Sequence, residues 1–288
     1  MKIRKAVFPA AGFGTRFLPV TKAQPKEMLP IVDKPVIQYL VEEAVAAGIE
    51  EIIIVTGRGK RSIEDHFDYS YELEQTLVER GKRQLLKEVR GIAEMAKFIY
   101  VRQPRPLGDG HAILCAKEVI GNEPFVVLFG DDLVDSKVPA IKQLMNVYEE
   151  KNAPVIALEK INKKDSRKYG IIEPIKGKDD GRLHEIKSLI EKPDPKSAPS
   201  DLAIVGKYVL TPEIWDALEK AKCGPDGEIR LINAFQLMLG KTPLYGYELE
   251  GKRYDTGDKL GFLQATIDYA LKREDIGPAL KKYIQGLK

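Results

Sequence analysis

Apolar residues in the first half of the chain form two patterns that alternate along the sequence. Short continuous runs at residues 6–8, 52–55, 98–101 and 125–129 are typical of strands buried on both faces of a parallel sheet. Residues 35–47 instead place apolar side chains at the spacing of one buried helical face, and Gly48 ends that helix. A strand–helix–strand order predicts a right-handed crossover. The loop after the first strand then lies at the carboxyl edge of the sheet, where open α/β sheets bind ligands.

Residues 62–96 are highly charged and have helical spacing. We predict that they form helices that cover the sheet and carry no chemistry. The apolar side chains expected to anchor these helices are Phe67, Tyr71, Leu73, Leu77, Leu85 and Leu86.

The second half of the chain has shorter strands and more turns. Strands are predicted at residues 155–158, 171–174, 183–190, 203–210 and 244–249, and helices at 213–221 and 228–239, with Trp215 in the core. Asp258 has the position of a helix cap. The predicted fold class is therefore α/β: a Rossmann-like, mostly parallel mixed sheet flanked by helices, with a smaller β portion. We predict one domain, 1–288, with halves 1–150 and 151–288.

Composition narrows the classes of function. The 288 residues are 43% hydrophobic and 31% charged, as in ordinary globular proteins, and the net charge is only +3 with both signs interspersed. A nucleic-acid partner is therefore not expected. Cys115 and Cys223 lie far apart without metal-ligand spacing, so neither a disulfide framework nor a zinc site is predicted. No apolar signal region opens the sequence and no apolar run exceeds strand length, which predicts a cytoplasmic protein without a membrane partner.

The loop after the first strand has the features of a phosphate cradle. Gly12 and Gly14 allow positive φ and a close approach to the backbone amides, while Arg16 and Lys26 supply cations. No Gly-Lys-Ser/Thr follows, which excludes a Walker A loop, and Phe17 occupies the third glycine position of a dinucleotide fingerprint. A simple glycine turn would explain Gly12 and Gly14 alone, but it would not explain the two cations.

A second candidate site follows the fourth apolar run. Asp131 and Asp132 come where this predicted central strand reaches the ligand edge. Magnesium prefers hard oxygen ligands and is typically held by one or two carboxylates plus substrate phosphates. Either aspartate alone would be explained by a turn, but the pair at a central strand end favours a metal site.

The loop at residues 103–111 (QPRPLGDGH) contains two prolines and two glycines, which interrupt regular structure and expose backbone amides. The side-chain amide of Gln103 offers both a donor and an acceptor, as the edge of a uracil base requires. Taken alone, Gln103 is better explained as a loop side chain in solvent. His111 is predicted to cap or pack the following helix.

These segments resemble the signature of the sugar-1-phosphate nucleotidylyltransferases. The resemblance rests on residues 6–16 (AVFPAAGFGTR) and 26–30 (KEMLP), and it extends over nearly the whole chain. Residues 32–39 (VDKPVIQY) and the long helical insertion at 68–86 are most similar to the bacterial uridylyltransferase branch of that family. The resemblance implies a nucleotidyltransferase (GT-A-like) fold, and implies that uridylyl is transferred from UTP to glucose 1-phosphate with Mg²⁺ as cofactor. It also implies a homodimer or homotetramer, with the last helices packed on the domain or on another subunit.

The resemblance also assigns residues to roles. The nucleotide-binding residues are Ala10, Ala11, Gly12, Gly14, Thr15, Glu27, Gln103 and Gly108. The sugar-binding residues are Asp132, Tyr169, Gly170, Glu191 and Gly206. The catalytic residues are Arg16, Lys26, Asp131 and Lys192, and the metal is assigned to Asp131 and Asp255.

Two alternatives remain open at this point. One is a thymidylyltransferase, which differs in the base and ribose that it accepts. The other is a regulator that binds sugar nucleotides without turnover, although such a protein would have no reason to keep Arg16, Lys26, Asp131 and Asp255 together. Asn233 replaces the aspartate usual in relatives, a change expected to affect local capping or packing and not the chemistry.

Overall fold

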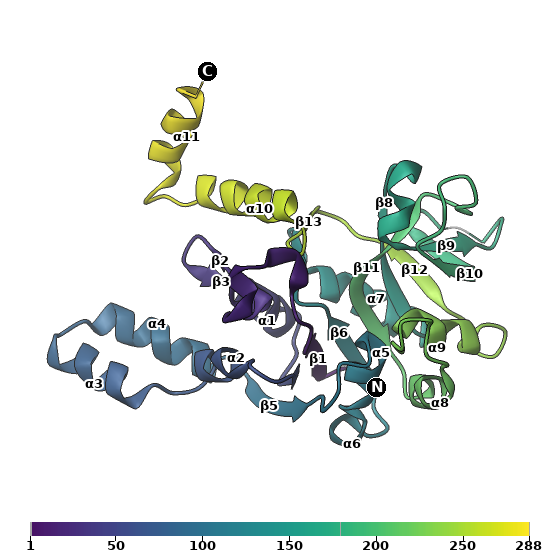
Figure 1. Ribbon diagram of the computed structural model, residues 1–288, viewed down its shortest axis with the longest axis horizontal. Helices are drawn as coiled ribbons and strands as arrows, with labels where there is room; N and C mark the ends of the chain where they lie inside the picture. The colour runs from purple at the N-terminus through teal and green to yellow at the C-terminus, as the bar shows by residue number, and fades with distance from the viewer. Residues whose placement is uncertain (1, 179, 288) are drawn as a thin grey trace.

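In the computed structural model, which describes residues 2–178 and 180–287, the predicted strands of the first half form a parallel sheet (Figure 1). The strands are β1 (Lys5–Ala10), β4 (Glu51–Thr56), β5 (Lys97–Arg102) and β6 (Phe125–Leu128), in the order β5-β4-β1-β6. All three pairings are parallel, so the carboxyl ends of these strands reach one edge of the sheet.

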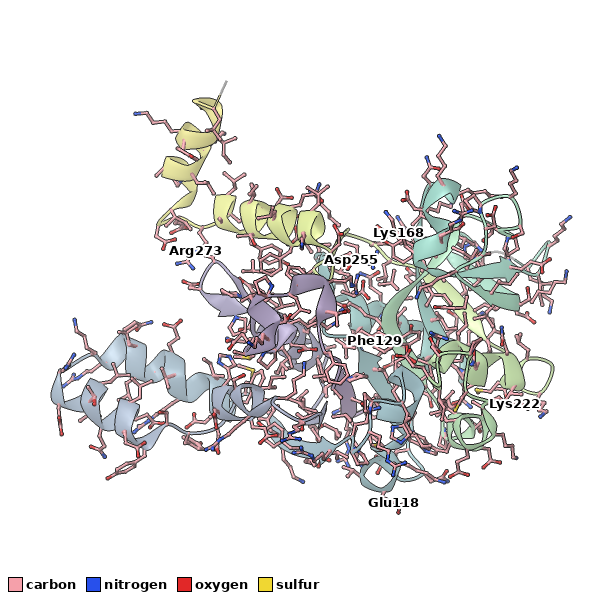
Figure 2. All side chains as sticks on the ribbon, in the orientation of Figure 1. Glu118, Phe129, Lys168, Lys222, Asp255 and Arg273 are labelled. Carbon is pink, nitrogen blue, oxygen red and sulfur yellow. The ribbon has the colours of Figure 1, made fainter. Side chains whose placement is uncertain are left out.

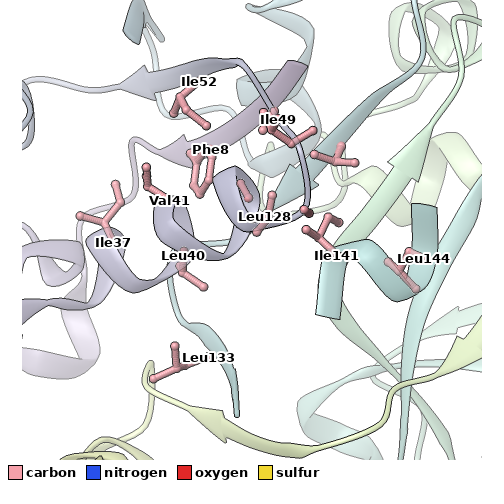
Figure 3. Packing of buried hydrophobic residues seen from close by; sticks show 14 of the residues in the cluster. Phe8, Ile37, Leu40, Val41, Ile49, Ile52, Leu128, Leu133, Ile141 and Leu144 are labelled. Carbon is pink, nitrogen blue, oxygen red and sulfur yellow. The ribbon is translucent and has the colours of Figure 1, made fainter. Parts of the chain in front are cut away.

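Helices cover both faces of this sheet, as predicted. On one face, α1 (Val36–Ala46) and α7 (Ala140–Lys151) bury an apolar core that includes Phe8 and Leu128 (Figure 3). On the other face, Val7 and Phe125 pack with α5 (Asp109–Leu114), α6 (Lys117–Ile120), α8 (Glu213–Lys220) and α9 (Leu231–Met238). Consecutive residues of β1 thus enter opposite cores, which explains why the strand is apolar on both faces.

The second half extends the same sheet. β11 (Leu202–Leu210) pairs antiparallel with β6, and the order continues through β8 (Val155–Lys160), β12 (Tyr245–Glu248), β10 (Leu183–Glu191) and β9 (Gly170–Pro174). The nine-stranded sheet is therefore mixed, and its parallel pairings are those of the first half and β8–β12. Trp215 is buried and stacks on Phe125, as expected of a core residue.

Two short ribbons complete the framework. β7 (Asp132–Asp135) pairs antiparallel with β13 (Lys252–Asp255), and this pairing opposes Asp132 to Asp255. β2 (Pro30–Ile31) pairs with β3 (Lys34–Pro35). The ribbon of β7 and β13 was not predicted, because four-residue strands rich in charge lack a strand pattern.

Of the helices predicted at residues 62–96, the first packs into the core beside the sheet through Ile63, but the others form no cover over the sheet, and for them the prediction was wrong. After α2 (Arg61–His66), α3 (Tyr71–Glu79) and α4 (Arg83–Glu94) form a hairpin that extends away from the sheet (Figure 1). Phe67 and Leu77 are buried as expected, but Tyr71, Leu73 and Leu85 are exposed. Helical spacing reveals an amphipathic face, but not which surface that face meets.

The last two helices are α10 (Lys259–Leu271) and α11 (Gly277–Gln285), which lie along the top of the view, apart from β9 and β10 (Figure 1). Asp258 caps α10 by accepting hydrogen bonds from the Leu260 and Gly261 amides, as predicted. Within the described part of the chain, no helix has the length and apolar character needed to cross a bilayer.

Candidate active site

The first of two adjoining cavities opens at the carboxyl ends of β1, β5 and β6, and we call it the glycine-loop cavity. It has a volume of about 480 Å³, which is within the range of small-molecule sites. Seven of the nucleotide-binding residues assigned from the sequence line it, together with Lys26: Ala11, Gly12, Gly14, Thr15, Glu27, Gln103 and Gly108. Ala10, the eighth, is buried at the end of β1 and is not among the lining residues.

Local hydrogen bonds stabilise the conformation of the loop at residues 11–17. Gly14 has a left-handed φ of 65° and precedes a short 3₁₀ turn at residues 15–17. The Thr21 hydroxyl donates to the Gly14 carbonyl at 2.8 Å. A side chain at Gly14 would approach the Lys26 Cβ to 3.1 Å, so glycine is needed both for the turn and for the position of Lys26.

Asp131 follows β6 and is the centre of the cationic cluster. Lys26 Nζ lies 2.6 Å from its Oδ2, and the more exposed Arg16 guanidinium lies 3.5 Å from the same oxygen. Burial raises the pKa of Asp131, but the charges of Lys26 and Arg16 outweigh burial and leave that pKa below its ordinary value. Burial lowers the pKa of Lys26, but the charges of Asp131 and Glu27 outweigh burial and leave that pKa above its ordinary value.

Asp255 approaches Asp131 from the other end of the sequence. A Cβ placed on Gly257 would lie 2.6 Å from Asp131 Oδ2 and 3.1 Å from Asp255 Oδ1, so both carboxylates converge on one small space. Burial, followed by the neighbouring charge of Asp132, raises the pKa of Asp255. Residues 2–178 and 180–287 contain no group of three or more His, Cys, Asp or Glu side chains placed to hold a metal. Two carboxylates alone would leave most of the coordination positions of an ion to water or substrate oxygens.

The second cavity adjoins the first and is lined mainly by charged side chains, so we call it the ion-pair cavity. Its volume is about 330 Å³. All the sugar-binding residues assigned from the sequence line it, with Arg16, Asp131, Lys192 and Asp255: Asp132, Tyr169, Gly170, Glu191 and Gly206. Glu191 and Lys192 form an ion pair at 3.2 Å, and Lys192 has a left-handed φ of 47°.

Asp132 lies in a buried network that includes a residue the sequence analysis missed. Arg253 donates through Nε to Asp132 Oδ1 at 2.5 Å and through Nη1 to Glu159 at 3.0 Å. The other Asp132 oxygen accepts from the Gly206 amide at 2.8 Å. A side chain at Gly206 would approach Phe129 Cβ to 2.6 Å and would overlap Asp132, so this glycine permits the close approach. Asp132 is thus held by the protein, while Asp131 faces both cavities.

A shared wall separates the two cavities. Four residues line both of them: Asp109, Phe129, Asp131 and Glu228 (Phe129 is labelled in Figure 2). Asp109 Oδ1 accepts from the Leu231 amide at 2.9 Å, and the Ile229 amide donates to the Leu107 carbonyl at 2.7 Å. The loop at residues 224–230 is therefore hydrogen-bonded to the loop that carries Gln103 and Gly108.

The helix predicted at residues 228–239 was wrong at its start. Residues 228–230 belong to this loop, and α9 begins only at Leu231. Arg230 lines the ion-pair cavity and pairs with Asp226 and Glu228. The aromatic ring of Tyr208 also lines that cavity, between Phe129 and Phe235. Nothing in the local sequence distinguishes Arg230 or Tyr208 from ordinary surface and core residues, so only the tertiary structure identifies them.

Glu27 lines the glycine-loop cavity although its side chain is fully buried. Lys60, itself buried, donates to Glu27 Oε2 at 2.9 Å. Glu27 Oε1 has no hydrogen-bond partner among the described residues. The pair links the segment that carries Lys26 to the start of α2, and the sequence analysis did not identify Lys60.

The sequence also matches a known family and known structures. The profile of the family described as nucleotidyl transferase matches residues 5–272. A UTP–glucose-1-phosphate uridylyltransferase of Staphylococcus haemolyticus is 54% identical over 99% of both chains, and one of Bacillus subtilis is 50% identical over 99% of this chain and 97% of its own. The structure of a UTP-bound UGPase from Acinetobacter baumannii is 41% identical, covers all of both chains and superposes with a TM-score of 0.92.

Proposed function

The chain belongs to the nucleotidyl transferase family, and from its two adjoining cavities we propose that it transfers a uridylyl group from UTP to glucose 1-phosphate, releasing pyrophosphate. The observation that carries this proposal is the position of Asp131, Lys26 and Arg16 at the junction of the cavities. UTP occupies the glycine-loop cavity, and glucose 1-phosphate occupies the ion-pair cavity. In terms of sequence, the nucleotide half is residues 1–150 and the sugar half is residues 151–288.

The reaction needs no general base from the protein. The attacking oxygen belongs to a phosphate monoester whose second pKa is about 6, so it is largely a dianion at neutral pH. The task of the site is to hold two anions in line and to reduce their repulsion. This explains a site that is rich in cations and has no nucleophile–histidine pair in its lining.

Each cation has a distinct task in this proposal. Arg16 and the amides of the glycine loop hold the leaving pyrophosphate, because the guanidinium is exposed beside Asp131, where the two cavities meet. Lys26 contacts the α-phosphoryl group, and its bond to Asp131 keeps it charged and in place. Lys192 holds the sugar phosphate, while Glu191 accepts hydrogen bonds from sugar hydroxyls.

Nucleotidyl transferases of this kind generally use a divalent metal. We propose that the ion is Mg²⁺ and that Asp131 and Asp255 hold it, because their oxygens converge on one space, which the Arg16 guanidinium also borders, and because Mg²⁺ usually takes its other ligands from water and substrate phosphates. When bound, the ion would neutralise charge on the reacting phosphates.

We also propose that the protein forms a homodimer or homotetramer through its C-terminal helices. Leu260, Leu263, Ile267 and Tyr283 on α10 and α11 are exposed, and an apolar groove lies between the two helices. Such a surface is unusual on a monomer. Sedimentation of the wild type and of a Leu263→Glu/Tyr283→Glu variant tests this, and a monomeric wild type would contradict it.

We also propose a cytoplasmic location, which suits the free thiols of Cys115 and Cys223.

The central test is an assay of pyrophosphate release with glucose 1-phosphate and each of UTP, dTTP, ATP and GTP. We expect UTP to be the preferred substrate. Higher efficiency with dTTP would instead identify a thymidylyltransferase. Tight binding of UDP-glucose with no turnover of any nucleotide would indicate a non-catalytic regulator.

A further inference from the structure

Gln103 has an amide group whose orientation is fixed inside the glycine-loop cavity. Its side chain is buried, and its Nε2 lies 3.0 Å from the Gly108 carbonyl oxygen and 3.0 Å from His111 Nδ1. A carbonyl oxygen can only accept, so the nitrogen and not the oxygen of the amide must face Gly108. Both N–H groups of Nε2 are therefore used within the protein.

This arrangement also determines the proton position on His111. Its Nδ1 faces the Gln103 amide nitrogen at 3.0 Å, which can only donate, and the Cys115 sulfur at 3.9 Å, whose S–H is a weak donor. Nδ1 must then be the unprotonated, accepting nitrogen, with the proton on Nε2. Burial lowers the pKa of the His111 imidazole and raises the pKa of the Cys115 thiol, so both stay in the forms that this geometry requires.

The consequence is that only Oε1 of Gln103 remains to meet a ligand. This oxygen has no hydrogen-bond partner within residues 2–178 and 180–287, although Gln103 lines the cavity. A lone acceptor matches the N3–H donor of uracil or thymine. It opposes the bare N3 acceptor of cytosine, which would leave two acceptors facing each other at a buried position.

We propose that His111 is a positioning residue for base selection: by accepting from Gln103, it fixes the amide so that the site takes uracil and rejects cytosine. The inference rests on the proposed function, since it assumes that the base of UTP lies against Gln103. According to this inference, Gln103 does not discriminate between UTP and dTTP, because both bases carry the N3–H group. Any preference between those two must come from the methyl group and the ribose hydroxyl.

The test compares kcat/KM for UTP and CTP, with glucose 1-phosphate, in variants that change only the partner of Gln103. His111→Asn offers an amide oxygen close to where Nδ1 lies and should keep the wild-type UTP:CTP ratio. His111→Phe keeps an aromatic ring but removes the acceptor, so the ratio should fall about five- to tenfold, the equivalent of one hydrogen bond. His111→Lys presents donors to the amide, and the ratio should fall further, mainly through a higher KM for UTP.

A matched control is present in the chain. His66 lies 2.9 Å from Gln38 Oε1 through its Nε2 and contacts neither cavity, so His66→Phe removes a similar His–Gln pair. It should leave the UTP:CTP ratio unchanged. If His111→Phe and His111→Lys turn over UTP with the wild-type ratio, His111 only packs the helix and the proposal is wrong.

A second measurement does not depend on activity. The protein has three histidines, so ¹⁵N spectra of the wild type and His111→Asn assign the His111 ring directly. We expect a bare Nδ1 and a protonated Nε2, and a proton on Nδ1 would overturn the inference. If the wild type releases no pyrophosphate from UTP, the proposed function fails, whereas the spectra still decide whether His111 accepts from Gln103.

Discussion

The two cavities share a wall, but different kinds of chemical group line them. The glycine-loop cavity is formed largely by the main chain and small residues of loops that follow parallel strands, and the half-buried Lys26 is the cation in its lining. The ion-pair cavity is formed by charged side chains on or beside antiparallel strands, and these side chains hold one another, as Arg253 holds Asp132.

The difference has a physical reason. Phosphates are recognised well by backbone amides and a few cations, and any sequence that forms the loop supplies the amides. Sugar hydroxyls have to be distinguished from one another, which requires side chains held in fixed directions. We therefore expect the first cavity to be sensitive to added bulk and to the loss of a cation, and the second to be sensitive to any change in its ion pairs.

The largest expected effect is that of Lys26→Ala, at the junction of the cavities. Turnover should fall about 10²- to 10³-fold, since a preorganised charge aimed at the reacting phosphates is lost. The unfolding midpoint should change by little, because Arg16 still neutralises Asp131. Lys34→Ala, which removes an ion pair with Glu42 outside both cavities, is the control. Near-native turnover of Lys26→Ala would contradict the catalytic role proposed for Lys26.

The next effect concerns the two converging aspartates. Asp131→Asn and Asp255→Asn should each lower turnover about 10²-fold at moderate Mg²⁺, with partial recovery at high Mg²⁺. Their combined loss should be smaller than the product of the single losses, because residues that share one ion act as a unit. A double-mutant cycle at several Mg²⁺ concentrations measures this. Fully multiplicative losses without Mg²⁺ dependence would show that the two side chains share no metal.

Two glycine substitutions compare the cavities directly. Gly12→Ala meets no protein atom within 4 Å, so the protein should fold normally and KM for UTP alone should rise, by about tenfold. Gly206→Ala would overlap Asp132 and Phe129 and should raise KM for glucose 1-phosphate by a similar factor. Steady-state kinetics with each substrate varied in turn separates the two effects. An equal rise in both KM values for either variant would mean that the cavities are not distinct.

The smallest effect is on stability, and its sign should differ between the two aspartates in metal-free buffer. The pKa of Asp131 is lowered in the folded state, so its charge adds stability above the ordinary pKa of 3.8 and this contribution is lost as pH falls through the folded pKa. The pKa of Asp255 is raised, so its contribution is present at low pH and is lost as pH rises through the folded pKa.

At neutral pH we therefore expect Asp131→Asn to lower the unfolding midpoint and Asp255→Asn to raise it. Thermal unfolding from neutral pH down through 3.8 checks both, and the two differences should shrink toward the acid end. Shifts of the same sign in the two variants would contradict the assigned electrostatic environments.

The sequence predicted those parts of the molecule that depend on local patterns. The buried strands, the loop at Gly12 and Gly14, the aspartates after β6 and the Asp258 cap each follow from residues close together in the chain. Their positions around the cavities then followed from the rule that parallel strands share one carboxyl edge.

The remaining features depend on residues that are distant in sequence. Arg253 is identified only when β13 pairs with β7 and brings it to Asp132, and Lys60 only when α2 approaches Glu27. The direction of the α3–α4 hairpin could not be predicted either, because an amphipathic helix does not specify its partner. The role of His111 required the geometry of a single amide group, which no spacing of residues reveals.

The order of strands in the sheet has a consequence for how the protein is made. β5-β4-β1-β6 is complete once Leu128 has left the ribosome, but β12 (Tyr245–Glu248) must insert between β8 and β10 from near the end of the chain. The second half of the sheet therefore cannot close until β12 has been synthesised, and β8 exposes an unpaired edge until then. A ribosome that stalls before residue 245 would release a chain with the strands and loops of the glycine-loop cavity, an open sheet and a tendency to aggregate.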